Sequence, residues 1–198
     1  MQQKSLYDQC KEAARLWSES SFPIAFTGAG ISVPSGIPDF RSPGGLWSRF
    51  DPFEVATAEA LDQDPEKVWE FLFEANLLFG KAAPNPAHLA LARLERDHGL
   101  KAVITQNIDN LHQAAGSSQV VEYHGSGLRY YCQGCFKEYA SDLALELKKQ
   151  DLPWTCSACG RIIRPDIVFF GEQIPARALE QSAEYVKQAD LILVIGTS

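Results

Sequence analysis

Residues 22–30 read FPIAFTGAG, an apolar run that ends in a Gly-Ala-Gly turn. This composition predicts a buried strand, Phe22 to Thr27, that leads into a loop. Glycines without side chains let backbone N–H groups approach a pyrophosphate, as in dinucleotide-binding folds. The third glycine of G-x-G-x-x-G is absent, because Val33 stands there and Pro34 follows at once. We therefore expect a nucleotide loop with a short or broken helix after it, and a merely tight turn is the alternative.

Outward from this segment, apolar runs and helical periodicities alternate along the chain. Asp64-Pro65 and Asn85-Pro86 each place a cap before a proline at the first helical position. The predicted strands are 22–27, 101–105, 120–122, 162–169 and 191–195; the predicted helices are 4–20, one from 65 with Trp69, Phe71, Leu72, Leu77 and Leu78 on its apolar side, 86 to about 98, and about 176–188. This alternation predicts an α/β fold, a Rossmann-like parallel sheet with helices on both faces.

Composition places the chain among globular proteins. Of its 198 residues, 45% are hydrophobic and 22% are charged, which excludes disordered, collagenous and disulfide-rich classes. The net charge of −7 provides no basic field for phosphate backbones, so we expect no direct nucleic-acid partner. Residues 1–20 lack the apolar core of a signal peptide, and the longest aliphatic run, 191–195, is far shorter than a membrane span. We expect a cytoplasmic protein without a membrane partner.

Four of the five cysteines form two C-x-x-C pairs, Cys132 with Cys135 and Cys156 with Cys159. Their separation is typical of tetrahedral zinc sites. Four thiolates fill the coordination shell, so we expect a structural zinc ion, and four unligated cysteines are the alternative. The predicted division is a Rossmann-like domain at 1–125 and 163–198, with a helical insertion at about 42–84, and a small inserted zinc-ribbon module with four cysteine ligands at 126–162.

Polar residues follow the second and third predicted strands. Gln106, Asn107 and Asp109 lie at a strand's carboxyl end, where ligands of open parallel sheets bind. Their amide and carboxylate groups suit recognition of a carboxamide such as nicotinamide, although Asp109 could equally cap the next helix. His124 follows the strand 120–122. Imidazoles serve as general bases near neutral pH, but a histidine at a strand end is often an ordinary surface or core residue.

In this order, these motifs resemble the sirtuin family of NAD-dependent protein-lysine deacylases. The segments that carry the resemblance are 28–32 (GAGIS), 36–41 (GIPDFR), 105–109 (TQNID), 124–125 (HG), the four cysteines, 164–172 (RPDIVFFGE) and 196–198 (GTS). The likeness spans about residues 22–198, and the ordered set is far more specific than any single motif.

The resemblance implies an NAD site. Its residues are Gly28, Ala29, Gly30 and Ser32 at the phosphates, Asp39, Phe40 and Arg41 on a mobile loop over the nicotinamide ribose, Trp47, the pocket residues Gln106, Asn107, Ile108 and Asp109, and Gly196, Thr197 and Ser198. The glycines and prolines of residues 28–45 suit such a jointed loop. The implied catalytic set is His124, Asn107 and Asp109, with His124 as the base.

The resemblance also implies the reaction. The acyl carbonyl oxygen of a substrate lysine attacks the ribose carbon that carries nicotinamide, and nicotinamide leaves. His124 draws a proton from a ribose hydroxyl, whose oxygen attacks the amidate carbon, and water releases lysine and O-acyl-ADP-ribose. The implied partners are proteins with acylated lysines, bound as an extended peptide that adds to an edge. That edge comprises Val168, Phe169, Phe170, Gly171 and Glu172.

Two departures from the family pattern bear on specificity and extent. Members that favour succinyl or malonyl lysine carry Tyr-x-x-Arg where this chain has Leu72 and Ala75. We therefore expect a preference for neutral acyl groups, with Glu74 repelling a carboxylate. The family continues past Ser198 with strands that complete the adenosine site, so we expect weaker NAD binding by these 198 residues alone.

Two other functions use the same features. An NAD-dependent protein mono-ADP-ribosyltransferase could share the cofactor pocket and differ in its nucleophile. A non-catalytic zinc- and NAD-binding module needs no base, so the presence of His124 together with Asn107 and Asp109 favours an enzyme.

Overall fold

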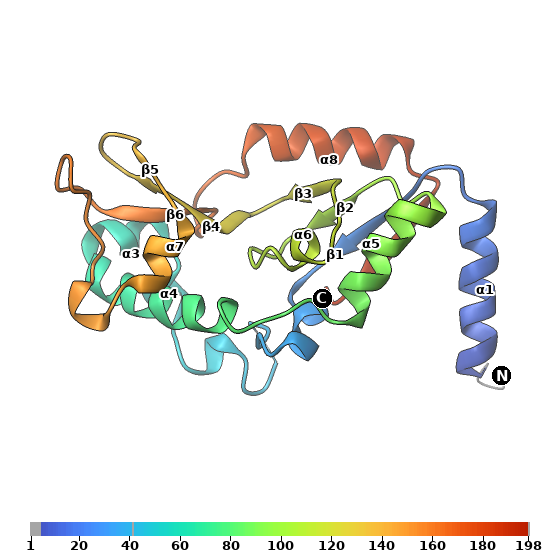
Figure 1. The fold of residues 1–198 in the computed structure, drawn as a ribbon, viewed down its shortest axis with the longest axis horizontal. Coiled ribbons are helices and arrows are strands. Elements are labelled where there is room, and N and C mark those ends of the chain that lie inside the picture. The colour runs from blue at the N-terminus through green and yellow to red at the C-terminus, as the bar shows by residue number, and fades with distance from the viewer. Residues whose placement is uncertain (1–4, 41, 198) are drawn as a thin grey trace.

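The computed structural model describes residues 5–40 and 42–197 (Figure 1). In chain order its elements are α1 (Leu6–Glu19), β1 (Pro23–Thr27), η1 (Ala29–Ser35), η2 (Leu46–Ser48), α2 (Pro52–Val55), α3 (Ala58–Gln63), α4 (Pro65–Phe79), α5 (Pro86–His98), β2 (Val103–Thr105), α6 (Leu111–Ala114), β3 (Val120–Glu122), β4 (Gly125–Cys132), β5 (Glu138–Tyr139), α7 (Ser141–Glu146), η3 (Lys149–Asp151), β6 (Ile163–Ile167), α8 (Ala176–Gln188) and β7 (Leu191–Ile195). Arg41 and Ser198, which the resemblance places in the NAD site, lie outside the described residues.

The larger sheet has the parallel arrangement that the sequence predicts. Within the described residues its four strands lie in the order β3-β2-β1-β7. β1 pairs in parallel with β2 on one side and β7 on the other, so that Ala25 lies opposite both Val103 and Leu193. The carboxyl ends of β1, β2 and β3 therefore open at the same edge of the sheet.

Helices cover both faces of this sheet, which confirms the predicted α/β fold. α5 and α8 lie on opposite sides of it in Figure 1. Alternate residues of β1 point to opposite faces: Ala25 packs in a cluster with Leu91 of α5, whereas Ile24 packs in a cluster with Ala178 of α8. Burial on both faces explains why the strands read as nearly continuous apolar runs.

The caps of α4 and α5 confirm their predicted starts. Asp64 and Asn85 each accept a bond from a first-turn backbone N–H, at 3.2 and 2.9 Å. Gly99 ends α5 at φ 80°, a conformation that costs glycine little. One residue corrects the prediction: Leu77 is 47% exposed, because it lies beside the buried stripe of α4 that contains Leu72. No helix in the described ranges is long and apolar enough to cross a membrane.

The second sheet corrects one strand prediction. Among the described residues, three strands form it in the order β5-β4-β6. β6, the centre of the predicted strand 162–169, pairs antiparallel with β4 instead of joining the parallel sheet. An apolar run indicates a strand but not its partner. β4 itself escaped prediction because Gly125 and Gly127 interrupt its pattern.

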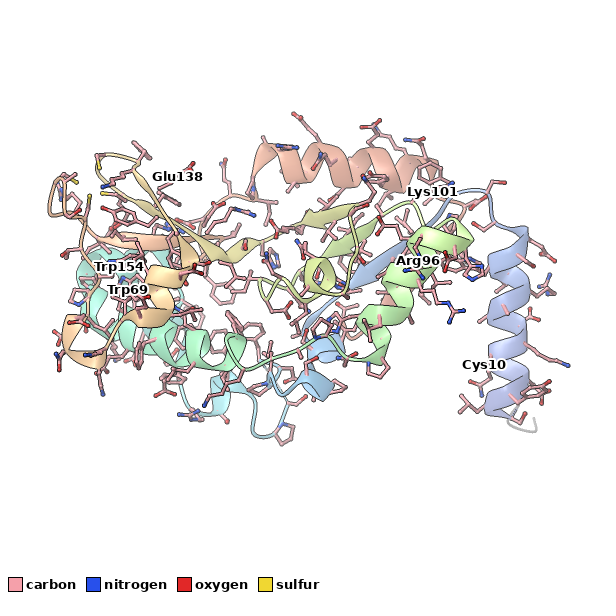
Figure 2. The ribbon with its side chains drawn as sticks, in the orientation of Figure 1. Cys10, Trp69, Arg96, Lys101, Glu138 and Trp154 are labelled. Atoms are coloured by element: carbon pink, nitrogen blue, oxygen red, sulfur yellow. The ribbon has the colours of Figure 1, made fainter. Side chains whose placement is uncertain are left out.

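Helices α2, α3 and α4 pack on this second sheet. One hydrophobic cluster includes Trp69, Cys132 and Ile163, and the Trp69 indole N–H donates to the Ile163 carbonyl at 3.0 Å. Trp69 and Trp154 meet edge to face, with ring centroids 5.9 Å apart (Figure 2). The helical segment 42–84 thus shares a core with the cysteine-containing segment. The domain limits drawn from the sequence stay a proposal.

Candidate active site and metal centre

Three parallel strands end where the sequence places the candidate residues. β1 leads into the glycine turn, β2 leads into residues 106–110, and β3 leads into His124. The backbone N–H of Gln106 donates to the Thr27 carbonyl at 3.0 Å. The first two turns are therefore joined directly.

The glycine turn packs closely against the turn that follows β7. Gly28 N–H donates to the Ile195 carbonyl at 3.1 Å, and Gly30 N–H donates to the Gly196 carbonyl at 2.8 Å. A Cβ atom on Gly30 would lie 2.8 Å from Gly196 Cα, so a larger residue does not fit. This close approach explains the glycines as a tight turn, and it is compatible with a nucleotide loop at the same edge. Pro34 lies inside the short η1, as the expected broken helix requires.

Ser32, Asn107 and Asp109 form a hydrogen-bond network behind this turn. Ser32 Oγ donates to Asp109 Oδ2 at 2.6 Å, and both side chains are buried. Asn107 Nδ2 donates to Ser32 Oγ and to the Gly28 carbonyl, each at 3.1 Å. Asp109 Oδ1 accepts the backbone N–H of Leu111 at 2.9 Å. Asp109 therefore binds the first backbone N–H of α6 and anchors the network at once. Its role in recognising a carboxamide stays a prediction.

The remainder of the 106–109 segment is held from both sides. Gln106 Nε2 donates to Thr197 Oγ1 at 3.0 Å. On the other side, Gly127 N–H donates to the Ile108 carbonyl at 2.8 Å. These contacts tie the segment to the turn after β7 and to β4.

His124 lies half-buried beside the same segment. Its Nδ1 atom is 3.1 Å from the Gln106 carbonyl oxygen. A carbonyl oxygen only accepts, so Nδ1 carries the hydrogen and Nε2 of the neutral ring is the free acceptor. That tautomer is the one a general base needs. The roles of His124, Asn107 and Asp109 in catalysis stay predictions.

The loop around Asp39 is tied back onto itself and onto aromatic residues. The backbone N–H groups of Leu46 and Trp47 donate to the carbonyls of Asp39 and Phe40 at 2.9 and 3.0 Å. The Trp47 ring lies 5.0 Å from Phe40 and 6.3 Å from Phe170 between centroids. Trp47 thus connects the loop to the predicted substrate edge.

The predicted substrate edge already has a backbone partner on one side. Phe170 N–H donates to the Ala56 carbonyl at 2.8 Å, and the Phe170 carbonyl accepts from Ala58 N–H at 3.3 Å. Val168 N–H donates to the His124 carbonyl at 3.0 Å, which joins the edge to the candidate base. Glu172, predicted to meet substrate, instead directs both carboxylate oxygens inward to protein donors.

The residues assigned to acyl selectivity are largely internal. Leu72 and Ala75 are buried, and Leu72 belongs to the core that contains Trp69. The Glu74 carboxylate accepts a hydrogen bond from Arg49 Nη2 at 2.7 Å. Because this pairing compensates its charge, Glu74 is a weaker source of repulsion than the sequence suggested.

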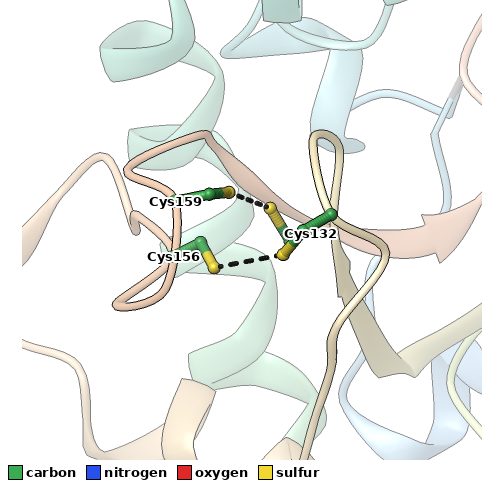
Figure 3. A group of neighbouring side chains, drawn as sticks. Cys132, Cys156 and Cys159 are labelled. Atoms are coloured by element: carbon green, nitrogen blue, oxygen red, sulfur yellow. Dashed lines mark hydrogen bonds between the residues drawn. The ribbon is translucent and has the colours of Figure 1, made fainter.

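The four paired cysteines converge at one point. Their Sγ atoms all lie within 4.8 Å of one another, with Cys132 and Cys159 at 3.3 Å and Cys135 and Cys156 at 3.6 Å (Figure 3). Tetrahedral zinc with Zn–S bonds of about 2.3 Å holds its sulfurs roughly 3.8 Å apart. The cluster therefore fits the structural zinc ion that the spacing predicts.

The surroundings of Cys156 favour the thiolate that zinc binds. The Tyr139 hydroxyl donates to Cys156 Sγ at 3.0 Å. This hydrogen bond lowers the pKa of the Cys156 thiol to about 6. The Ala158 N–H also donates to Cys156 Sγ, at 3.4 Å. In the same way, the Gly134 N–H donates to Cys132 Sγ at 3.3 Å.

Comparison with known proteins decides the family. The Sir2 family model matches residues 28–198. This chain belongs to the Sir2 family. It is 48% identical over 187 residues to an NAD-dependent protein deacylase of Aeropyrum pernix, a match that covers 94% of this chain and 75% of that protein. It is also 48% identical over 191 residues to an NAD-dependent protein deacetylase of Sulfurisphaera tokodaii, with coverage of 96% and 75%.

Solved Sir2 structures share the fold of this chain. A Sir2 homologue in complex with NAD aligns with a TM-score of 0.86 at 42% identity, covering 95% of this chain and 72% of that one. A Sir2 variant with a deacetylated p53 peptide and 3'-O-acetyl ADP-ribose aligns with a TM-score of 0.87 at 42% identity, covering 94% and 76%. The sirtuin resemblance carried by the motifs is confirmed.

Two further histidines of this Sir2 chain lie behind the glycine turn, and the sequence alone did not single them out. The rings of His88 and His112 are fully buried, with centroids 4.9 Å apart. His112 Nε2 lies 2.9 Å from Thr27 Oγ1, directly below the glycine turn. The signal that could have found His88 is its place at the third helical position after the Asn85 cap, where its Nδ1 accepts the Asn85 N–H at 3.3 Å.

Proposed function

We propose that this Sir2 chain is an NAD-dependent protein-lysine deacylase, which transfers the acyl group of an acyl-lysine to ADP-ribose and releases nicotinamide. One observation carries the proposal: the His124 imidazole, with Nδ1 held by the Gln106 carbonyl, shares an edge with the network of Ser32, Asn107 and Asp109. The NAD-dependent deacylases and deacetylases to which the chain is similar support it.

The donor set at this edge suits NAD. When bound, NAD supplies a glycosidic bond whose cleavage frees nicotinamide and exposes a ribose carbon to the acyl oxygen. In our proposal the glycine turn and Ser32 face the phosphates, because glycine N–H groups approach anions without steric hindrance. Asn107 and Asp109 face the carboxamide, which offers both a donor and an acceptor. Thr197, tied to Gln106 at 3.0 Å, borders the same site.

His124 then acts as the base. Its Nε2 atom takes the proton of a ribose hydroxyl, while the Gln106 carbonyl orients the ring and stabilises the imidazolium. The rings of Phe40 and Trp47, which contact each other, then shield the reacting groups from water on the side of the Asp39 loop.

The substrate in this proposal is a protein whose acylated lysine enters in an extended segment along residues 168–171. A neutral acyl group is favoured, because Arg49, a cation beside the helix that contains Leu72, is already paired with Glu74. We further propose a cytoplasmic location, which is supported by cysteines arranged as metal ligands rather than as disulfides.

The test is nicotinamide release from NAD by the purified chain with and without an acetyl-lysine peptide. His124→Ala is expected to lower kcat by about 10²–10⁴-fold and to leave NAD binding intact. His98→Ala, which changes an exposed histidine at the end of α5, is the matched control. Label transferred from NAD to protein would instead identify a mono-ADP-ribosyltransferase. NAD binding without any nicotinamide release would identify a non-catalytic module.

A further inference from the structure

The turn after β6 is closed on itself by two hydrogen bonds. Glu172 N–H donates to the Phe169 carbonyl at 3.0 Å, and Phe169 N–H donates to Glu172 Oε2 at 2.9 Å. Gly171, at φ 89°, supplies the left-handed residue that lets the chain reverse. The shape of the predicted substrate edge therefore depends on the Glu172 side chain.

A buried guanidinium holds this turn from inside. Arg164, 5% exposed, donates from Nη1 to Glu172 Oε1 at 2.5 Å and from Nη2 to Glu172 Oε2 at 2.8 Å. Its Nη2 also donates to the Ile167 carbonyl at 2.7 Å, and its Cζ atom lies 4.6 Å from the Phe169 ring centroid. One planar fork thus ties the end of β6 to the turn.

The charges of this pair stabilise each other. Burial disfavours ionisation of Glu172, but the hydrogen bonds from Arg164 and Phe169 outweigh it and hold the pKa of Glu172 below its usual value. An ionised carboxylate accepts from two donors at once more strongly than a neutral amide does. The turn is therefore held most firmly when Arg164 and Glu172 are both charged.

The turn connects the candidate base with the segment next to Thr57. Val168 N–H donates to the His124 carbonyl, and Phe170 pairs with the chain next to Thr57. The same residues form the edge along which we propose the acylated peptide binds. A shift of the turn by a fraction of an ångström therefore changes the backbone groups that a peptide meets.

We propose that Arg164 and Glu172 are positioning residues for the acylated peptide: the pair fixes the 168–171 edge and does not itself contact the substrate. This inference rests on the proposed deacylase function, and it reassigns Glu172 from a substrate contact to an internal support. Loss of the pair weakens peptide binding and spares the NAD side, since the network of Ser32 and Asp109 lies on other elements.

The experiment uses Glu172→Gln, which keeps the shape and an acceptor for Phe169 N–H but removes the charge. Arg164→Lys, which keeps the charge but not the fork, serves as a second variant if the first does not fold. Asp166→Asn is the matched control, because Asp166 lies on the same strand and pairs at 3.0 Å with the half-exposed Arg129. For each protein, the affinity for a fluorescent acetyl-lysine peptide is measured by anisotropy. The peptide KM, kcat, NAD affinity and thermal unfolding are measured as well.

We expect each folded variant to raise peptide Kd and KM about tenfold, with kcat and NAD affinity changed by less than about twofold. The Asp166→Asn control should match the parent chain. The inference is overturned if both variants bind the peptide as tightly as the parent chain, or if they lose peptide and NAD affinity together. It is also overturned if the parent chain binds no peptide. If the parent chain binds the peptide but does not turn it over, only the proposed function is overturned. The ratio of peptide Kd between each variant and the parent still tests the role of Arg164 and Glu172.

Discussion

At the carboxyl edge of the parallel sheet, Ser32, Asn107 and Asp109 form a network in which they hydrogen-bond one another and the backbone, whereas in the cysteine cluster four thiols face one another. Asp109 takes donors on both oxygens, from Ser32 and from the Leu111 backbone. Cys132 and Cys156 are buried next to Cys159 and Cys135, sulfur against sulfur. The first arrangement is stable as it stands. The second needs a cation once its thiols ionise, since thiolates at such distances repel.

This difference predicts how the two regions respond to change. The network of Ser32, Asn107 and Asp109 consists of several hydrogen bonds, each of modest net strength, so single substitutions alter it in steps. The cysteine cluster depends on one shared ion, so it is retained or lost as a unit. Because helix α4 shares its core with the cluster, loss of the ion extends beyond the four ligands.

Removal of zinc should have the largest effect. Structural zinc contributes on the order of 10 kcal/mol to the folding of small zinc domains. A chelator is expected to open the second sheet and to loosen α4 through Trp69, while β1 and β2 stay folded because they belong to separate clusters. Hydrogen exchange measures this directly, as loss of protection in β4 and β6 but not in β1.

Cysteine variants sharpen the same comparison. Cys156→Ala should lose zinc and reproduce the exchange pattern of the chelated protein, whereas Cys10→Ala, at an exposed and distant position, should retain zinc. Unchanged protection of β4 after complete zinc removal would show that the core around Trp69 holds the second sheet without metal.

The two regions also differ in how far the sequence predicts them. The metal ligands follow from local spacing, since Cys132 and Cys135 define half of a site within four residues. Prediction of the Ser32, Asn107 and Asp109 network requires the topology of the sheet, which strand–helix alternation supplied for β1, β2, β3 and β7. The partner of β6 was missed because pairing is a long-range choice that no local pattern encodes.

Side-chain direction was the other limit. The sequence counted Glu172 among the residues of the predicted substrate edge but could not show that its carboxylate turns inward to Arg164. It did not single out His112 either, because no local pattern reveals that its ring is buried against Thr27. Such roles depend on tertiary contacts between residues far apart in the chain.

Acid should lower the stability of the chain through His112. Burial lowers the pKa of His112 to about 4, and it also lowers the pKa of His88; in an unfolded chain a histidine titrates near 6.5. Between these values the unfolded chain binds more protons, so the free energy of unfolding falls as pH falls from 6.5 to 4. His112 alone accounts for about 3 kcal/mol of that loss.

Denaturant unfolding at several pH values tests this contribution. His112→Gln should flatten the dependence between pH 6.5 and 4, because the glutamine amide does not titrate. His98→Gln, which changes an exposed histidine, should keep the slope of the parent chain. Equal slopes for the two variants would mean that His112 is not held neutral by its surroundings.

Ser32→Ala should have the smallest effect on stability and should separate the two regions most cleanly. The substitution leaves Asp109 Oδ2 and Asn107 Nδ2 without the hydroxyl between them, which is expected to lower the free energy of unfolding by about 1–2 kcal/mol. NAD affinity should fall about tenfold, because the proposed carboxamide groups lose their fixed orientation. Zinc retention should not change, since no contact of Ser32 reaches the cysteine segment among the described residues.

Ser18→Ala, which removes an exposed hydroxyl on α1, is the control. If Ser32→Ala released zinc as readily as it weakened NAD binding, the hydrogen-bond network and the cysteine cluster would be coupled through the fold. The prediction that they respond independently would then be wrong.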